Sequence, residues 1–197
     1  MSNLKKLVIA SGNIGKLREI NSLLQSLNID VLPQSVFNIP EVAEPHSTFI
    51  ENALAKARHA CRHTGLPALA DDSGICVNAL KGAPGVFSAR YAGESKSDQQ
   101  NNLKLVETLK NQPDRSAYYY CVIVLIHHAN DPQPIIAEGL WRGEITLEAR
   151  GEGGFGYDPY FMLPELSKTA AELDIDEKNK ISHRGQALAR LLEHLQS

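Results

Sequence analysis

The stretch LVIASGNIGKL, residues 7–17, joins an apolar run to a glycine-containing loop and then to the start of a helical pattern. The run from Leu7 to Ala10 predicts a short buried strand. Beyond the loop, apolar residues recur at the spacing of one helix face: Leu17, Ile20, Leu23, Leu24 and Leu27. The chain therefore opens with a strand, a loop and a helix.

The following residues continue the alternation of strands and helices. Residues 29–32 predict a second strand, and prolines at positions 33, 40 and 45 break the next stretch into a loop. Thr48 and Glu51 have the spacing of a capping box, so a second helix should begin at Thr48 and end near Gly65. One apolar stripe supports this helix: Ile50, Ala53, Leu54, Ala57 and Ala60.

Later segments predict longer strands. We expect a strand at 68–70, an acidic turn at 71–74 and another strand through Val77. Residues 116–127 are rich in β-branched and aromatic side chains and predict a long strand, with residues 135–148 as its partner strand. Two more helices are marked by apolar spacing, one by Leu103, Val106 and Leu109 and the last by Leu188, Leu191, Leu192 and Leu195. The pattern predicts an α/β layered fold with a mixed sheet.

Length and charge narrow the function. A chain of 197 residues predicts a single domain, 1–197, and a net charge of −3 without basic runs argues against nucleic acid or a membrane as a partner. The N-terminal apolar run is too short for a signal peptide, so we expect a cytoplasmic protein. Cys61, Cys76 and Cys121 show neither disulfide nor zinc spacing, and we expect three reduced, mostly buried thiols.

The loop after the first strand is a candidate phosphate site, because backbone N–H groups at a helix amino end favour an anion. Lys16 in the first helical turn strengthens this interpretation, although an ordinary glycine turn with a solvated lysine is an equal alternative. Leu17 stands where a Walker A loop needs Ser or Thr, which argues against a P-loop ATPase. The candidate phosphate-binding residues are Ser11, Gly12, Asn13, Ile14, Gly15 and Lys16.

Acidic residues suggest a magnesium site. Side chains alternate along an extended chain, so Asp71 and Asp72 should point to opposite faces, with one entering a site and the other structural. Magnesium needs few carboxylates beside water and phosphate, and Glu44 or Glu51 could complete the set. The alternatives are a turn that uses aspartate for its own backbone, a capping role for Glu51 and a solvated loop acid at position 44.

Other polar and aromatic residues could contact a nucleotide. Asn52 and Lys56 lie four apart on the second helix and can reach the same object. In the glycine-rich segment 151–157, Phe155 or Tyr157 could stack on a base, or serve as a core aromatic in a hairpin. His183 and Arg184 follow the N-cap candidate Ser182 and offer several donors, though an exposed histidine at a helix start is the commoner case.

Six motifs occur in order over nearly the whole chain: SGNIGK, TFIENALAKA, ADDSG, GAPGVFSARYAG, GGFGYDP and ISHRGQAL. Together they resemble the Ham1 family of pyrophosphatases that act on non-standard purine nucleoside triphosphates. The resemblance implies an elongated α/β fold, with a mixed twisted sheet flanked by helices and a central cleft between two lobes. It also implies a homodimer and Mg²⁺-dependent cleavage of ITP, dITP or XTP to the monophosphate and pyrophosphate.

The resemblance also implies roles for individual residues. Residues 11–16 and Lys56 would hold the phosphates, Glu44 and Asp72 the magnesium ion, and Asp72 would also act as the general base. Ser73 would lie beside the nucleotide. The base and sugar would be surrounded by Phe155, Gly156, Tyr157, Asp158, Lys178, His183 and Arg184. Ser11 replaces the threonine of many relatives and keeps the hydroxyl.

Two other functions are consistent with parts of the pattern. One is a Maf-like pyrophosphatase for modified pyrimidine or methylated nucleotides, against which the SHRGQ segment at 182–186 argues. The other is a nucleotide sensor that binds without turnover. Release of pyrophosphate from ITP distinguishes an enzyme from a sensor.

Overall fold

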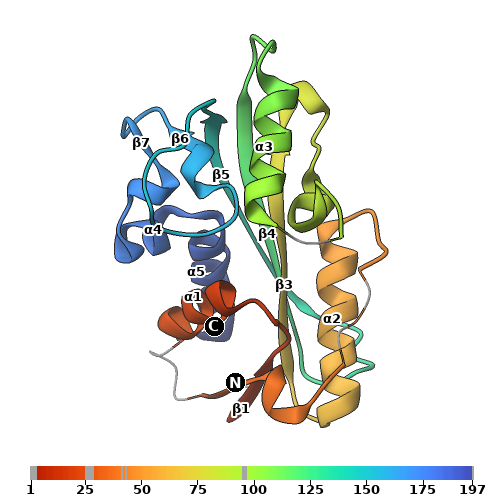
Figure 1. Cartoon of the computed structure of the whole chain (residues 1–197). Helices are drawn as coiled ribbons and strands as arrows, with labels where there is room; N and C mark the ends of the chain where they lie inside the picture. The colour runs from red at the N-terminus through yellow and green to blue at the C-terminus, as the bar shows by residue number, and fades with distance from the viewer. Residues whose placement is uncertain (1–3, 25–28, 41, 43, 95–96, 197) are drawn as a thin grey trace. The chain divides into compact units, whose positions relative to one another are not determined.

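A computed structural model describes residues 4–24, 29–40, 42, 44–94 and 97–196, without the side chains of residues 22 and 23. Helices and strands alternate as far as the strand at Ser116–Ile126, as the sequence predicts, and the remaining strands and the last two helices then follow one another (Figure 1). The expected helical positions of Leu27 and of the Leu23 side chain lie outside the described residues. No described helix is long and apolar enough to cross a membrane.

The strands form one mixed sheet in the order β2-β1-β3-β4-β5-β6-β7. Strand β1 pairs in parallel with β2 and with β3, whereas β6 pairs antiparallel with β5 and with β7. The mixed sheet that the sequence predicts is therefore confirmed. The bounds are β1 Lys6–Ile9, β2 Asp30–Pro33, β3 Ala68–Val77, β4 Ser116–Ile126, β5 Ile135–Ile145, β6 Phe161–Leu163 and β7 Lys168–Thr169.

Five α-helices accompany the sheet in the described part of the chain: α1 Ile14–Leu24, α2 Phe49–Thr64, α3 Asp98–Leu109, α4 Ile175–Ile181 and α5 His183–Gln196. Short 3₁₀ turns cover Gln34–Phe37, Asn78–Leu80, Gly85–Arg90, Asp158–Tyr160 and Ala170–Glu172. The chain divides into two compact units. The first contains residues 1–72, 121–139 and 184–197, and the second contains residues 73–120 and 140–183.

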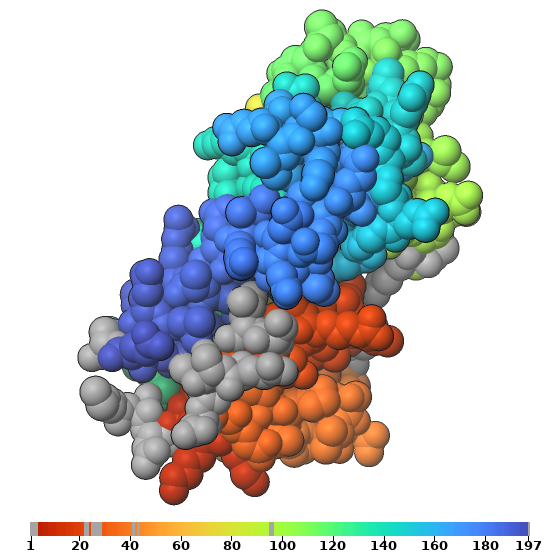
Figure 2. Space-filling model, turned by 90° about the vertical axis from the view of Figure 1, so that its left-hand side faces the viewer, coloured from red at the N-terminus to blue at the C-terminus, as the bar shows by residue number. Residues whose placement is uncertain are grey.

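The core of the first unit contains alternate residues of β1, β3 and β4 together with the apolar stripes of α1 and α5. Ile20 and Leu24 of α1 and Leu188 of α5 are fully buried there. The other face of α5 is exposed, and its deep-blue atoms are visible in Figure 2. Helix α2 lies on the opposite side of β1 and β3 (Figure 1), where its small residues Ala53, Ala57 and Ala60 are buried.

The predicted start of α2 is confirmed. Thr48 is the N-cap, and its hydroxyl accepts from the Glu51 backbone N–H at 3.3 Å. The same hydroxyl donates to the Glu51 carboxylate at 2.6 Å. Gly65 ends the helix in the left-handed conformation, with φ of +67°, which glycine adopts without the strain of a side chain.

Packing in the second unit differs from the predicted pattern at one helix. Leu105 and Leu109 of α3 are buried, but Leu103 is 58% exposed, so the expected apolar face was partly wrong. The buried face instead includes Asn101 and Asn102, whose side chains donate to backbone carbonyls in the turn after β3 and in the glycine-rich loop. Hydrogen bonding to these carbonyls offsets the cost of burying the amides.

The acidic turn predicted at 71–74 was wrong. Strand β3 runs without interruption through Asp71, Asp72, Ser73 and Gly74. Both aspartates are buried. Ion pairs with basic side chains offset the free-energy cost of burying their charges. The segment therefore places two adjacent carboxylates on opposite faces of one strand, not at a surface turn.

Candidate functional site

Alternation along β3 sends the two adjacent aspartates to different helices. Leu69, two residues before Asp71, packs in the core with α1 and α5, and Asp71 also contacts residues of these helices. Asp72 is on the other face and contacts Asn52 and Lys56 of α2. The prediction that the two side chains point to opposite faces is therefore confirmed, because side chains in a strand have a period of two.

Asp71 is held in a buried ion-pair network. One carboxylate oxygen lies 3.0 Å from Lys16 Nζ and accepts from Nε and Nη2 of Arg184, both at 3.2 Å. Another guanidinium nitrogen of Arg184 donates to Glu19. Burial alone would raise the pKa of Asp71, but Lys16 and Arg184 hold that pKa below its ordinary value. Two cations therefore balance two carboxylates at this point.

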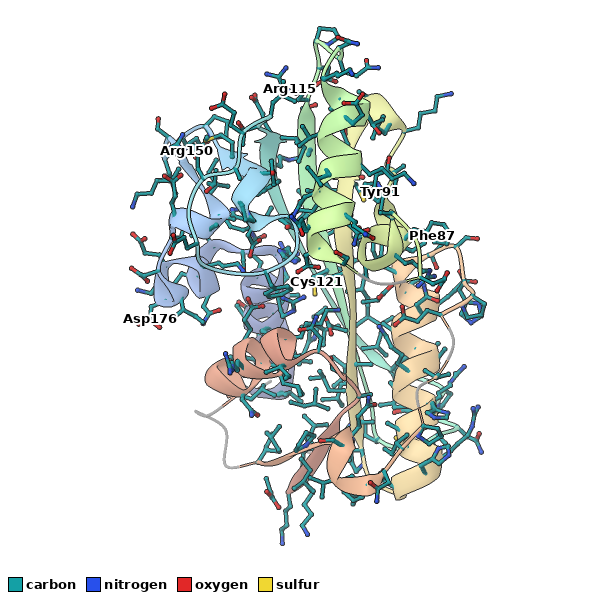
Figure 3. The ribbon with its side chains drawn as sticks, viewed as in Figure 1. Phe87, Tyr91, Arg115, Cys121, Arg150 and Asp176 are labelled. Carbon is teal, nitrogen blue, oxygen red and sulfur yellow. The ribbon has the colours of Figure 1, made fainter. Side chains whose placement is uncertain are left out.

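Cys121, labelled in Figure 3, lies on β4 near this network. Its side chain is fully buried, and burial raises the pKa of the thiol to about 12. All three cysteines are free and buried, as the sequence predicts. A thiol that stays protonated at neutral pH is a poor nucleophile, so Cys121 is part of the core.

Asp72 belongs to a second cluster, which contains more negative than positive charge. Lys56 Nζ lies 3.0 Å from Asp72 Oδ1 and 2.9 Å from Glu44 Oε1. Asn52 Nδ2 lies 3.4 Å from the other oxygen of Asp72. Burial raises the pKa of Asp72, although Lys56 beside it acts in the opposite direction. A buried carboxylate with a raised pKa is a better proton acceptor than an exposed aspartate.

The position of Lys56 tests whether a metal ion fits. Its ammonium lies within about 3 Å of two carboxylates, so Glu44 and Asp72 converge on one cation. Among the described residues no group of three or more His, Cys, Asp or Glu side chains surrounds a common point. Two carboxylates with water and phosphate are sufficient for magnesium. Glu51, the other candidate, contacts its own N-cap Thr48.

The loop before α1 is partly satisfied by its own side chains. Ser11 Oγ accepts from the Asn13 N–H at 3.2 Å, and Asn13 Oδ1 accepts from the Lys16 N–H at 3.1 Å. Gly12, Asn13 and Ile14 are exposed. The loop is therefore accessible at a helix amino end, as a phosphate site requires, with Lys16 pointing to Asp71.

In the second unit, Asp158 organises the expected base-side residues. Its Oδ2 accepts from Lys178 Nζ at 2.8 Å and from the Phe155 backbone N–H at 2.9 Å. Lys178 Nζ in turn lies 4.9 Å from the centre of the Phe155 ring. A Cβ on Gly154 would lie 2.0 Å from the Asp158 carboxylate, so only glycine lets the loop wrap this closely.

Aromatic side chains surround His183. The Tyr119 ring is stacked on the imidazole, with centroids 4.6 Å apart and planes 6° from parallel, and Trp141 is stacked at 6.4 Å. Tyr119 also donates its hydroxyl to Asp158 Oδ1 at 3.2 Å. His183 is 5% exposed and is therefore not the exposed histidine that commonly begins a helix.

The proposed stacking role of Tyr157 is contradicted by its placement. Tyr157 is 4% exposed, packs in the core of the second unit and donates its hydroxyl to the Ser88 carbonyl at 2.7 Å. The neighbouring Gly156 is held by Asp98, which accepts from its N–H, and by Asn102, which donates to its carbonyl. Phe155 is the aromatic side chain of this segment that is partly exposed.

The placement of Arg184 also differs from expectation. The family resemblance implies a place beside the base and sugar, and in the structure the side chain is buried and bonded to Asp71 and Glu19. The sequence patterns did not identify Glu19 and Tyr119 as partners of the candidate site residues. A glutamate on the predicted first helix carried no local signal, whereas the regular alternation of Tyr119 with buried neighbours on β4 could have identified it. Ser73 lies half-buried on β3.

The model of the Ham1 family matches residues 7–194. The chain is 68% identical to the dITP/XTP pyrophosphatase of Nitrosomonas europaea, in a match that covers 98% of this chain and 95% of the relative. It is 62% identical to the dITP/XTP pyrophosphatase of Chromobacterium violaceum, in a match that covers 98% of each chain. A HAM1 protein from Coxiella burnetii has a TM-score of 0.92 at 52% identity, covering 98% of both chains. The chain belongs to the Ham1 family.

Proposed function

We propose that this protein hydrolyses non-standard purine nucleoside triphosphates, namely ITP, dITP and XTP, to the nucleoside monophosphate and pyrophosphate. The observation that carries the proposal is the convergence of Glu44 and Asp72 on one ammonium, with Asp72 buried. Family membership and relatives that carry the name dITP/XTP pyrophosphatase support the substrate class.

Glu44 and Asp72 would hold Mg²⁺, which when bound neutralises charge on the phosphates. Asp72 orients a water molecule and takes its proton as the water oxygen bonds to the α phosphorus. The bond from that phosphorus to the bridging oxygen breaks, and pyrophosphate leaves with the electron pair. One carboxylate oxygen of Asp72 faces the Asn52 amide and the other faces the Lys56 ammonium, which stabilises the ionised form needed by a base.

Lysines stabilise the charge of the leaving pyrophosphate. Lys56 already contacts the two acidic residues, and Lys16 lies in the first turn of α1 beside the exposed loop of residues 11–16. Both are mostly buried at the side chain, with 12% and 16% exposure, so water screens them only partly. Their charges therefore act more strongly on phosphate than those of fully exposed lysines would.

The residues around Asp158 suit an uncharged planar base. Phe155 provides a partly exposed ring, and Lys178 and His183 provide donors for an oxygen at C6 of hypoxanthine or xanthine. Adenine carries an amino donor at C6 and would leave those donors unpaired. Guanine keeps the oxygen at C6 but adds an amino group at C2, so the protein must reject guanine through its contacts with the substituent at C2. Each unpaired buried group costs about 1–3 kcal/mol, which is roughly 5- to 150-fold in kcat/KM.

Two further features belong to the proposal. The family resemblance supports a homodimer, and light scattering at micromolar concentration should give twice the mass of the 21.6 kDa chain. A monomer in that measurement would contradict the assembly without affecting the activity. We also expect the protein to act on the nucleotide pool of the cytoplasm.

The deciding experiment measures pyrophosphate and orthophosphate released from ITP, dITP, XTP, GTP and ATP with Mg²⁺. We expect pyrophosphate from the first three and much less from the last two. Orthophosphate with a nucleoside diphosphate would contradict the cleavage site. Nucleotide binding without either product would instead identify a sensor, and turnover confined to modified pyrimidine nucleotides would indicate Maf-like specificity.

A further inference from the structure

A chain of contacts in the second unit links two base-side groups through one side chain. Tyr119 lies on β4, between Ala117 and Cys121 in the alternation of that strand, and its side chain is almost completely buried. The ring contacts His183, and the hydroxyl contacts Asp158. Neither contact would be expected of a residue that only fills space.

The hydroxyl completes the hydrogen bonding of a buried carboxylate. Asp158 Oδ2 receives two donors, Lys178 Nζ and the Phe155 N–H, whereas Oδ1 receives the Tyr119 hydroxyl at 3.2 Å. Burial, followed by the Asp158 charge, raises the pKa of Tyr119 well above its ordinary value. The phenol is therefore protonated, and able to donate, at neutral pH. Without it, one oxygen of a buried carboxylate would lose its donor, and the carboxylate could rotate.

The ring sets the direction of the imidazole. Two parallel rings with centroids 4.6 Å apart leave the covered face of His183 closed to a base. The stacking also fixes the directions in which the ring nitrogen atoms can form hydrogen bonds. Trp141, stacked on Tyr119 with ring centroids 6.3 Å apart, and Phe161, in edge contact with Tyr119 at 4.7 Å, restrict the tyrosine in turn.

We propose that Tyr119 is a specificity-determining positioning residue, which fixes the His183 ring by stacking and the Asp158 carboxylate by hydrogen bonding. The proposal rests on the proposed function, since it concerns recognition of the purine base. Tyr119 acts through His183, Lys178 and the Phe155 N–H without touching the substrate. A small displacement of such donors strongly weakens their hydrogen bonds to the base, because the strength of a hydrogen bond depends steeply on its geometry.

The first test replaces Tyr119 by phenylalanine, which keeps the ring and removes the hydroxyl. We expect kcat/KM for ITP to fall about 10-fold, and that for ATP to fall much less, so that the ITP-to-ATP ratio narrows. Tyr118→Phe is the matched control. It is the adjacent residue on β4, half-buried, and its hydroxyl lies beside Cys76. The control should leave the ratio unchanged.

The second test needs no catalysis. Calorimetry compares the affinities of wild type and Tyr119→Phe for IMP and AMP. We expect IMP to bind about 10-fold more weakly to the variant and AMP to be unaffected. Because both affinities refer to the folded fraction, partial unfolding of the variant lowers the apparent site number and leaves their ratio intact.

A third measurement tests the route through Asp158. In a double-mutant cycle with Asp158→Asn, adding Tyr119→Phe should cause no further loss of the ITP-to-ATP ratio, because its partner is already altered. Additive effects would contradict the hydrogen-bonded route. Equal loss on ITP and ATP, or an unchanged ratio with an unchanged IMP affinity, would overturn the proposal. If wild type releases no pyrophosphate from ITP, the proposed function itself fails, which is a separate result from the behaviour of Tyr119→Phe.

Discussion

Asp72 in the first unit and Asp158 in the second are both buried carboxylates paired with a lysine, Lys56 at 3.0 Å and Lys178 at 2.8 Å. Their surroundings differ in charge. Lys56 is shared with the carboxylate of Glu44, which leaves two negative charges against one positive charge. Asp158 and Lys178 form an ion pair of opposite charges, and their neighbours include a phenol, a backbone N–H and an aromatic ring.

This difference indicates a division of labour. An excess of carboxylate favours a cation and a reactive water, as expected where phosphate is cleaved. A neutral group with its donors locked in place favours an uncharged ligand, which must be read by hydrogen-bond direction and stacking. Variants that affect only one of the two groups should therefore separate turnover from base selectivity.

The largest effect is expected for Asp72→Asn. The change keeps the shape of the side chain but removes the proton acceptor and one charge of the cation site, so kcat for ITP should fall by at least about 10²-fold. The melting temperature should change little. Pyrophosphate release and thermal unfolding check the two statements. Turnover within a few-fold of wild type would show that another group is the base.

The matched change at the neighbouring residue, Asp71→Asn, should act on stability. It leaves Arg184 and Lys16 with one buried carboxylate fewer, and we expect the free energy of unfolding to fall by about 3 kcal/mol. Because the pKa of Asp71 is lowered on folding, the wild-type contribution is present at neutral pH and disappears progressively as pH falls below about 4. Urea unfolding at pH 7 and at pH 3 should show this difference narrowing. If Asp71→Asn instead abolishes turnover while Asp72→Asn does not, the two faces are assigned backwards.

Lys16→Ala and Asp158→Asn distinguish the two proposed roles, phosphate binding and base selection. Loss of Lys16 should lower kcat/KM on ITP and ATP by the same factor, about 10-fold, since both substrates carry the same triphosphate. Loss of the Asp158 charge should lower ITP hydrolysis more than ATP hydrolysis. The comparison requires only the two substrates with each variant. If Asp158→Asn, like Lys16→Ala, lowers kcat/KM on ITP and on ATP by the same factor, Asp158 does not contribute to base selection.

Arg184→Ala tests a residue whose expected and observed positions differ. The base-side role that the family resemblance implies would narrow the ITP-to-ATP ratio on this change. The contacts of Arg184 with Asp71 and Glu19 instead predict lower stability and equal loss on both substrates. We expect the second result. Kinetics with both nucleotides and urea unfolding of the same variant decide between them.

A smaller effect concerns pH. Asp72 acts as a base when ionised, so activity should fall as pH decreases through its pKa. Lys56 lowers that pKa, and Lys56→Gln should therefore move the acidic limb of kcat to higher pH, in addition to reducing its plateau. Arg58→Gln removes a positive charge from the same helix and is the control. If the acidic limb of the kcat profile stays at the same pH in Lys56→Gln, ionisation of Asp72 does not control that limb.

The smallest effect is expected at the start of α2, which carries Asn52 and Lys56. Thr48→Ala removes the N-cap and should lower stability by about 1 kcal/mol, with kcat unchanged at 25 °C. Thermal unfolding and pyrophosphate release are sufficient to check it. A large loss of activity would show that the geometry around Asp72 depends on the first turn of this helix.

Much of this arrangement followed from local patterns. The period of two along β3 predicted that Asp71 and Asp72 diverge, and the capping box located the start of α2. Six short motifs in order indicated the Ham1 family, and the match of the family model to residues 7–194 confirms this membership. Such features depend on neighbours in the sequence or on a stretch of a few turns, so the sequence alone determines them.

Other features depended on tertiary contacts. Arg184 pairs with Glu19 across 165 residues of chain, and Asp158 pairs with Tyr119 across 39. Local patterns place each of these residues on a helix or a strand but do not indicate which buried charge will compensate another. The partners were decided by packing, because a buried charge or hydroxyl is stable only where the folded chain brings a matching group within hydrogen-bond distance.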